Sequence, residues 1–251
     1  MKAIIWREIK VTFNSVFGAI MQFAIPVFMI LLFATSLSGN FGKMTVPGME
    51  INYIEFFAPG LFGYMTFFLF TISFSFLSID SRTGMLTIIA LSKASLRSYF
   101  WGKYVFQLAL TFIKILLIML ITMLLVGSIP DFSFANAILF IITLLLSVAI
   151  WFSLGMLGGI YIQREDLRQV VFALVTLPLT FTSSMYYGIE RMPTIIRWIA
   201  MCNPLTYICN LFRGCYLNVL PADYLLQLSI LFVITAVSLT AALWSLRKVK
   251  F

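Results

Sequence analysis

The chain has 251 residues, of which 62% are hydrophobic and 10% charged, with 17 basic and 9 acidic side chains. It contains no His, which removes imidazole general bases, His-containing zinc sites and the common His-based catalytic triads. This composition leaves little sequence for a soluble or catalytic module, so we expect one membrane domain over residues 1–251.

Long apolar stretches recur along the whole chain. A hydrocarbon core about 30 Å thick requires roughly 20 apolar residues in helical form. The sequence predicts six such spans, at Ile20–Leu37, Phe57–Ile79, Tyr104–Val126, Ala137–Ile162, Val170–Met185 and Leu225–Leu246. The predicted fold is therefore an all-α integral membrane protein with six transmembrane helices.

The basic residues lie beside these spans and not along one continuous face, so they indicate orientation and not nucleic-acid binding. One side holds Lys2, Arg7, Lys10, Arg82, Lys93, Arg97, Lys103, Arg164, Arg168, Arg247, Lys248 and Lys250, and the other Lys43, Arg191, Arg197 and Arg213. By the positive-inside rule both termini are cytoplasmic, which requires an even number of spans. The apolar stretch Ile195–Val219 is then not a seventh crossing. We expect it to form helices that dip into the outer interface, within an outer re-entrant region over residues 186–222.

Residues 1–18 are predicted to form an amphipathic helix on the inner leaflet. Apolar Ile4, Ile5, Ile9 and Phe13 are set at helical spacing against Lys2, Arg7, Glu8 and Lys10. An ordinary cytosolic cap is the alternative. The following apolar run is too long for a signal peptide, so we expect it to be retained.

The chain lacks the usual means of driving transport by itself. All its acidic residues fall at span boundaries or in loops, whereas an ion-coupled carrier normally buries a carboxylate in mid-membrane. No phosphate-binding G-x-x-x-x-G-K-[ST] loop is present, so ATP and its Mg²⁺ would have to be bound by another chain. We expect no metal site, and we interpret Cys202, Cys209 and Cys215 as small apolar filler in helices, with a disulfide as the alternative.

The cytoplasmic segment 80–103 between the second and third spans has the composition of a docking element. Gly84 can end the second span, and Leu86, Ile89 and Leu96 would form an apolar strip flanked by Arg82, Lys93, Arg97 and Lys103. Such a helix lies on a membrane or in the groove of a partner. A solvated basic loop is the alternative reading.

Three further features complete the pattern. Lys114 is a charge inside the third span, where it either faces a transport pathway, or snorkels or bonds to backbone carbonyls between helices. Gly155 and Gly159 have the GxxxG spacing of closely packed helices. Near the other end, Pro204 cannot donate to a helical ladder and biases Asn203 away from helical angles, so a short outer helix should stop there and could close the pathway from outside. An ordinary external loop is the alternative.

The outer segment carries the most specific signal. The spacing of Pro178, Phe181, Ser183, Pro193, Trp198, Asn203-Pro204-Leu205-Thr206-Tyr207 and Arg213 closely resembles the C-terminal part of ABC-2-type permeases, the membrane subunits of one class of ABC exporters. The resemblance extends over the whole chain, with its interfacial helix, six spans and coupling helix. In the coupling segment Gly84, Leu86, Ser92, Ser95 and Gly102-Lys103 match the family, while Lys93 stands where Pro is usual and Thr87 where Glu is usual.

This resemblance implies half of a transporter in a bacterial or archaeal cytoplasmic membrane. A second permease half, identical or different, would complete the pathway among membrane lipids, and two copies of an ATP-binding cassette subunit would hold ATP and Mg²⁺. The residues implied to couple to the ATPase are Gly84, Leu86, Ile89, Ser92, Lys93, Ser95 and Arg97. Those implied for the outer gate are Pro193, Trp198, Asn203, Pro204, Tyr207 and Arg213.

The expected cargo is a drug-like, lipid or amphipathic peptide molecule, as in multidrug efflux. Walls with few charges suit such a cargo, and 26 Phe against 10 Tyr and 5 Trp slightly disfavour a sugar polymer. A polysaccharide or glycolipid exporter remains open, as do an ion-coupled carrier or channel and a membrane scaffold without transport. None of these readings gives this chain an enzymatic activity.

Overall fold

The computed structural model describes residues 1–34, 36, 43–46, 49–91, 95–127, 133–162 and 164–247. The N-terminal part contains α1 (Lys2–Asn14), α2 (Val16–Met29), the π-helical turn η1 (Ile30–Ala34) and the strands β1 (Lys43–Val46) and β2 (Met49–Asn52). The middle contains α4 (Tyr53–Arg82), α5 (Met85–Leu91), α6 (Leu96–Val126) and α7 (Phe134–Tyr161). The C-terminal part contains α8 (Glu165–Phe181), the 3₁₀ turn η2 (Ile189–Arg191), α9 (Thr194–Cys202), α10 (Pro204–Tyr216) and α11 (Tyr224–Leu246).

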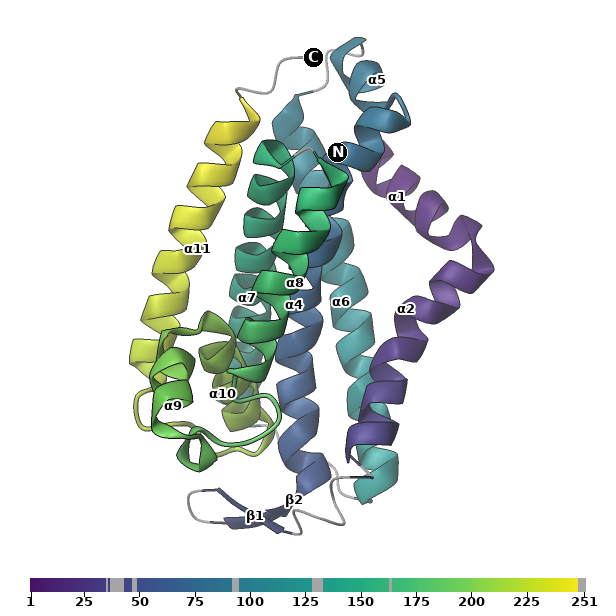
Figure 1. Ribbon diagram of the computed structural model, residues 1–251. Coiled ribbons are helices and arrows are strands. Elements are labelled where there is room, and N and C mark those ends of the chain that lie inside the picture. The colour runs from purple at the N-terminus through teal and green to yellow at the C-terminus, as the bar shows by residue number, and fades with distance from the viewer. Residues whose placement is uncertain are drawn as a thin grey trace.

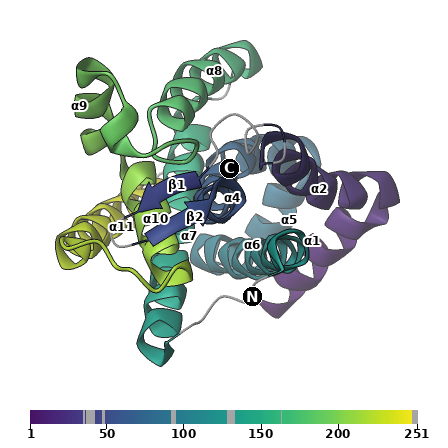
Figure 2. The ribbon, with the colours of Figure 1, turned by 90° about the horizontal axis from the view of Figure 1, so that it is seen from below.

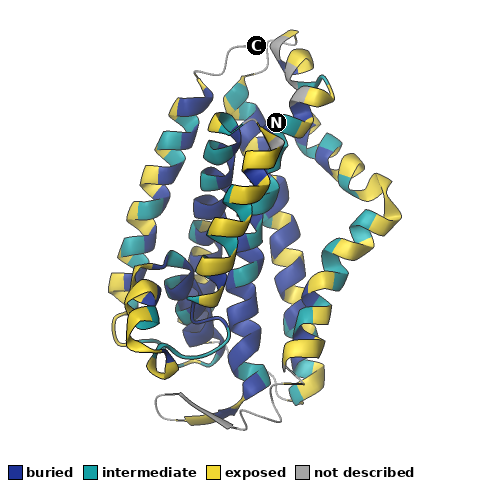
Figure 3. Ribbon diagram, viewed as in Figure 1, coloured by how far each residue is buried: buried dark blue, intermediate teal, exposed yellow. Residues whose placement is uncertain are grey.

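The helices form an elongated bundle with α4 and α7 at its centre (Figures 1 and 3). In each of these two helices 61% of the membrane-length window is buried, compared with 33% in α6 and 28% in α11. Helix α11 packs on α7, α6 packs on α4, and α10 packs on both central helices. The Phe side chains of α4 therefore serve mainly as packing surface, since Phe62, Phe67 and Phe74 are almost fully buried.

The two central helices approach closely at the predicted glycine pair. A Cβ atom on Gly155 would lie 2.4 Å from the carbonyl oxygen of Phe70, and one on Gly159 would lie 2.6 Å from that of Phe74. Neither contact leaves room for a methyl group, so the GxxxG spacing marks a true helix–helix interface.

Helix α2 is the least enclosed of the long helices. Only 11% of its membrane-length window is buried, and it stands at an angle to the rest of the bundle (Figures 1 and 3). It follows α1 directly across an elbow at Ser15, whose hydroxyl accepts a hydrogen bond from the Gly18 N–H at 3.1 Å and so caps α2. The helix therefore starts four residues before the predicted boundary at Ile20.

Within the part of the chain that the structure describes, five helices are long and apolar enough to cross a membrane: Val16–Phe33, Tyr53–Asp80, Leu96–Val126, Phe134–Tyr161 and Tyr224–Leu246. The predicted fifth span, Val170–Met185, corresponds to α8, which has 17 residues and ends at Phe181. At 1.5 Å per residue α8 is about 26 Å long. It runs between the same two ends of the bundle as its neighbours (Figure 1). Six crossings thus remain a prediction that agrees with this arrangement.

The two ends of the bundle differ in character. Helices α1 and α5 and the C-terminal end of α11 lie at one end, and β1, β2, α9 and α10 lie at the other (Figures 1 and 2). We refer to these as the inner and outer ends, following the predicted orientation. The strands pair antiparallel with Lys43 opposite Asn52 and Val46 opposite Met49. This hairpin is a departure from the all-α prediction, which passed over the turn-forming sequence Pro47-Gly48.

Candidate functional site

The coupling segment is divided into two helices and does not form one continuous element. Gly84 has a φ of +71°, a left-handed conformation that glycine adopts without steric cost, and it separates α4 from α5. Ser95 then caps α6, its hydroxyl accepting a hydrogen bond from the Ser98 N–H at 3.2 Å. Arg97 is exposed in the first turn of α6. Helix α5 is thus a seven-residue helix of its own at the inner end.

The predicted apolar strip of this segment is only partly correct. Ile89 is buried against the bundle at 3% exposure, whereas Ile88 and Leu91 are 59% and 80% exposed. Leu96 belongs to α6 and not to the strip. Leu86 lies on α5, but its side chain is outside the described part of the structure, as are Ser92 and Lys93 altogether. The side of α5 that is available to a partner is therefore the one that carries Ile88 and Leu91.

A buried group of charges joins three helices just beneath α5. We call it the inner charge cluster, and it consists of Arg7, Glu8, Asp80, Tyr99 and Lys103. The Lys103 Nζ lies 2.8 Å from Asp80 Oδ2 and 3.0 Å from Glu8 Oε1. The Arg7 guanidinium lies 2.9 Å from Asp80 Oδ1 and 2.7 Å from Glu8 Oε1. The Tyr99 hydroxyl donates to Asp80 Oδ2 at 2.5 Å.

The charges within the inner charge cluster neutralise one another almost completely. Two cations meet two anions, and Lys103 also lies 3.9 Å from the centroid of the Phe76 ring, a cation–π contact. Glu8, Asp80 and Lys103 are each 4% exposed or less. Because removing one partner would leave a buried charge unpaired, the cluster holds α1, the end of α4 and the start of α6 in one arrangement.

The electrostatics of Arg7 agree with this role. Burial by itself lowers the pKa of Arg7, but the charges of Asp80 and Glu8 and their hydrogen bonds outweigh it, so the pKa lies above its ordinary value. Arg7 is therefore charged at any physiological pH. The contact is reinforced by packing, since a Cβ on Gly102 would lie 2.9 Å from the Ile4 side chain.

The cluster corrects two sequence-based interpretations. Lys103 was expected to flank a docking strip, and Glu8 was expected on the polar face of an amphipathic helix, but both side chains point into the bundle. In the sequence, Glu8 is the acidic residue of α1 and Asp80 lies near the inner end of α4. These positions alone are a weak signal for a shared charge cluster. Hydropathy cannot show that three helix ends meet.

At the outer end, α9 stops at Cys202 and α10 begins at Pro204, as the proline rule predicts. Asn203 is 2% exposed, and its Oδ1 accepts from the Leu205 N–H at 2.9 Å, which caps α10. Its Nδ2 donates to the Leu179 carbonyl at 2.7 Å and to Thr182 Oγ1 at 3.2 Å. Asn203 therefore ties the break between α9 and α10 to the end of α8.

The other predicted gate residues are distributed over the same outer region. Pro193 is the N-cap of α9, and Trp198 is 67% exposed on that helix. The Tyr207 hydroxyl of α10 donates to the Met201 carbonyl. Cys209 packs its sulfur against the Gly60 carbonyl of α4 at 3.5 Å. The Cys209 contact places α10 beside the first turns of α4, and a re-entrant position of α10 in the membrane stays a prediction.

Arg213 is the buried charge of this region, at 7% exposure. Its Nη2 donates to the Ser184 carbonyl at 2.7 Å and its Nε to the Phe56 carbonyl at 3.2 Å, and its Cζ lies 3.7 Å from the Phe56 ring centroid. Arg213 thus fastens α10 to the start of α4 and to the segment after α8.

Aromatic rings gather at the outer end between α2, α4 and the end of α8, and we call them the outer aromatic cluster: Phe33, Tyr53, Phe57, Phe181 and Tyr186. Tyr186 lies 5.8 Å from Phe33, 5.9 Å from Phe57 and 5.7 Å from Phe181, measured between ring centroids. The Tyr53 hydroxyl donates to the Tyr186 carbonyl at 2.9 Å. Of these residues the sequence-based analysis singled out only Phe181, because the cluster is assembled from three separate segments.

The face of α4 that carries Tyr53 and Phe57 continues toward the inner end. At helical spacing it presents the half-buried residues Tyr64, Phe68, Thr71, Ser75 and Ser78. Helices α2 and α8 lie apart on two sides of α4 (Figure 2). We call this half-buried side the open face of α4, and it changes from aromatic near the outer end to hydroxyl-bearing near the inner end.

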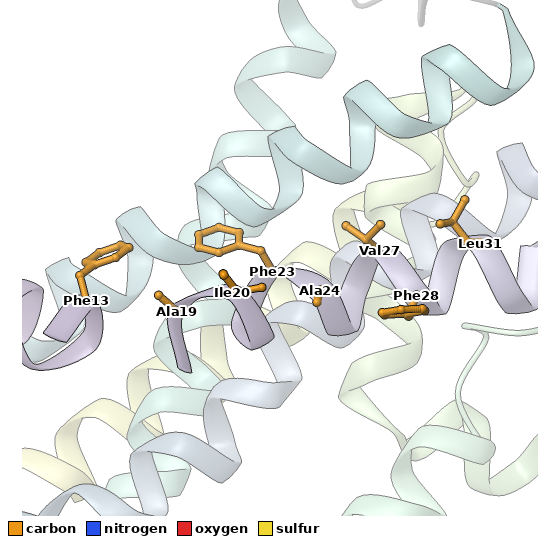
Figure 4. Close-up of a pocket in the computed structure, with 8 residues that line it drawn as sticks. All are labelled: Phe13, Ala19, Ile20, Phe23, Ala24, Val27, Phe28 and Leu31. Atoms are coloured by element: carbon orange, nitrogen blue, oxygen red, sulfur yellow. The ribbon is translucent and has the colours of Figure 1, made fainter. Parts of the chain in front are cut away.

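Helix α2, together with Phe13 of α1 and Leu31 of η1, carries an apolar groove of about 440 Å³ that is lined by eight apolar residues (Figure 4). Helix α8 contacts α4 through Phe172, whose ring lies 6.2 Å from those of Phe70 and Phe74. Its opposite side exposes a stripe of large apolar residues, Leu167, Val170, Leu174, Leu177 and Phe181. Both flanking helices therefore offer apolar surface.

Lys114 lies on the buried side of α6, at 6% exposure. Helical spacing places it on the same side as Lys103 and Gln107, which is the side turned toward α4 and the bundle interior. Among the residues that the structure describes, none forms a hydrogen bond or an ion pair with it. The role of Lys114 in a pathway therefore stays a prediction.

The sequence of this chain can be set beside known proteins now that its geometry is described. A family model described as "ABC-2 type transporter" matches residues 1–217. The chain belongs to the ABC-2 type transporter family. This confirms the resemblance seen in the sequence and makes the chain a membrane transport subunit that is not itself the ATPase.

Two relatives of this ABC-2 type chain carry transport names. The transport permease ycf38 of Cyanophora paradoxa is 28% identical over 192 residues, which cover 76% of this chain and 65% of the relative. The inner membrane transport permease YadH of Escherichia coli K12 is 25% identical over 105 residues, which cover 42% of this chain and 41% of YadH. The matches thus span less than two thirds of either relative.

Proposed function

We propose that this chain is the permease subunit of an ATP-driven exporter. A second permease half, identical or different, completes the pathway in the cytoplasmic membrane, and two ATP-binding subunits bind ATP and Mg²⁺ and supply the work. The termini lie on the cytoplasmic side. The cargo is a drug-like, lipid or amphipathic peptide molecule.

The observation that carries this proposal is the position of α5. It lies at the inner end (Figure 1) and presents Ile88 and Leu91 to its surroundings, while the neighbouring ends of α4 and α6 are joined by buried ion pairs. An exposed apolar helix on a rigid base suits a groove on a partner protein. A force on α5 would reach the long helices as a rigid-body movement.

The open face of α4 supports the proposed class of cargo. Its hydroxyl-bearing inner half can hydrogen-bond a polar group, and its aromatic outer half, with the apolar groove of α2, can hold an apolar one. The outer aromatic cluster closes this face at the outer end, since Tyr53 and Phe57 are fully buried. A molecule with both polar and apolar parts fits this succession of a hydroxyl-bearing and an aromatic surface best.

The docking role of α5 can be tested by co-purification. The chain is co-expressed with the ATP-binding cassette subunit encoded in the same genome, and the amount of ATPase retained on the tagged, detergent-solubilised permease is measured. We expect Ile88→Asp together with Leu91→Asp to reduce the retained ATPase at least tenfold, because the docking surface becomes charged. The matched control is Trp6→Ser, which removes an exposed apolar side chain from α1, 61% exposed, outside α5.

Full retention of the ATPase by the Ile88/Leu91 double variant would remove α5 as the docking element. Transport by the chain in vesicles that hold no ATPase would favour an ion-coupled carrier or channel instead.

A further inference from the structure

Helix α1 is fixed to the bundle by its inner side alone. Ile4 packs on Gly102, and Arg7 and Glu8 enter the inner charge cluster, whereas Trp6, Val11 and Phe13 are about half exposed or more. The contacts of α1 are thus made with the end of α4 and the start of α6, which are the two helix ends that hold α5 between them.

Helix α2 depends on α1 for its position at the inner end. It is joined to α1 through the single elbow residue Ser15, and little of its own surface is enclosed by the bundle. At the outer end it is held by Phe33, whose ring lies 6.3 Å from that of Phe57. A displacement of α1 would therefore swing the inner part of α2, which carries the apolar groove.

We propose that the inner charge cluster is the joint through which movement of the coupling helix α5 repositions α1 and, through the Ser15 elbow, α2. Glu8 is the positioning residue of this joint: it lies on α1 and contacts Lys103 of α6, and its neighbour Arg7 contacts Asp80 of α4. The joint opens and closes the side of the α4 face that α2 borders. This inference rests on the proposed function for its source of movement, but not for the structural link itself.

The structural link is tested in the permease alone. Spin labels are placed at positions 20 and 79, where Ile20 and Ile79 are 56% and 52% exposed on α2 and α4, and their distance distribution is measured by pulsed electron paramagnetic resonance. We expect Glu8→Gln to broaden or shift the distribution. Lys2→Gln, an exposed charge on the same helix, should leave it unchanged. An unchanged distribution in Glu8→Gln would overturn the proposal.

The same joint can be rebuilt with a covalent bond. The Cβ of Ile4 lies 3.0 Å from an ideal Cβ on Gly102, somewhat closer than a disulfide requires, so Ile4→Cys with Gly102→Cys can form one after a small shift. Cys202 is exposed and is replaced by Ser, while Cys209 and Cys215 are buried and free. In the Glu8→Gln background the oxidised pair should restore the narrow distance distribution, and reduction should abolish it again.

The consequence for coupling is measured in the complex with its ATPase, reconstituted in liposomes with rhodamine 6G as the probe. We expect Glu8→Gln to lower the amount of probe transported per ATP hydrolysed by about fivefold or more, the range of a typical coupling free energy. The oxidised cysteine pair should recover it. A variant that merely folds less well would lower transport and ATP hydrolysis together and leave their ratio unchanged.

Two failures can be told apart. If the unsubstituted complex shows no ATP-dependent transport although the spin-label result holds, the proposed function is wrong and the joint stands. If the unsubstituted complex transports and Glu8→Gln keeps the same ratio, or the disulfide fails to restore it, the joint is wrong and the proposed function stands.

Discussion

Lys114 is a charge that the described structure leaves without a bonding partner, so its removal should relieve a cost. A Lys at the centre of a membrane helix opposes insertion by roughly 2.5–3.5 kcal/mol. We therefore expect Lys114→Met to raise the melting temperature of the purified permease by about 3 °C or more. Lys2→Met, at an exposed position, is the control and should leave it unchanged. A lower melting temperature for Lys114→Met would mean that the charge has a stabilising partner.

Asn203 combines a helix cap with two further hydrogen bonds, so its contributions can be separated. Asn203→Ala should lower the free energy of unfolding by about 2–3 kcal/mol, since it loses the cap and leaves the Leu179 carbonyl without this donor. Asn203→Ser keeps a capping oxygen but is too short to reach Leu179, so it should lose about half as much. The measurement is denaturant unfolding in detergent. Equal losses of unfolding free energy in the two variants would contradict this separation of the cap from the Leu179 hydrogen bond.

At the scale of single residues, local rules could be predicted from the sequence and distant contacts could not. The break at Asn203-Pro204 follows from the geometry of proline, which acts on its immediate neighbours. The inner charge cluster joins Glu8, Asp80 and Lys103 across three helices. Each of them looks like an ordinary boundary charge in the sequence, and only the packing of the helices reveals that they neutralise one another.

At the scale of helices, the interface between α4 and α7 is the most demanding contact of the bundle. Gly155→Ala would place a methyl group 2.4 Å from the backbone oxygen of Phe70, which cannot move like a flexible side chain. We expect a loss of about 1–3 kcal/mol in the free energy of unfolding, measured by denaturant unfolding in detergent. Ile141→Ala, at a position of α7 that is 51% exposed, is the matched control. Similar stability for both variants would show that the helices can separate without cost.

Most helix ends could be predicted within a few residues, because hydropathy is a local property, but α6 begins at Leu96, well before the predicted start at Tyr104. The errors have local causes as well. Helix α2 begins earlier than expected because Ser15 caps it, and the coupling segment divides because Gly84 and Ser95 end one helix and start the next. The predicted strip over Leu86, Ile89 and Leu96 assumed one helix, so it placed Ile89 on the wrong side.

At the scale of the whole molecule, the single chain encloses its central helices but leaves much of its other apolar surface exposed. The central helices are buried, while α2 and α8 present apolar surface that the chain itself does not cover (Figure 3), and the open face of α4 is half-buried. Composition predicted a membrane domain without its own source of energy, because that conclusion depends on which residues are missing from the sequence. The shape of the open face could not be predicted, since it arises from the way α2 and α8 stand apart.

The central claim is that this chain is a conduit driven from its inner end by a separate ATPase. The most direct measurement is uptake of rhodamine 6G and of a fluorescent phospholipid analogue into inside-out proteoliposomes that contain the chain with or without its ATP-binding partner. The account predicts uptake that requires both the partner and ATP and that is lost in the Ile88→Asp, Leu91→Asp double variant. Uptake by the chain without the partner, driven by an ion gradient in the absence of ATP, would contradict it.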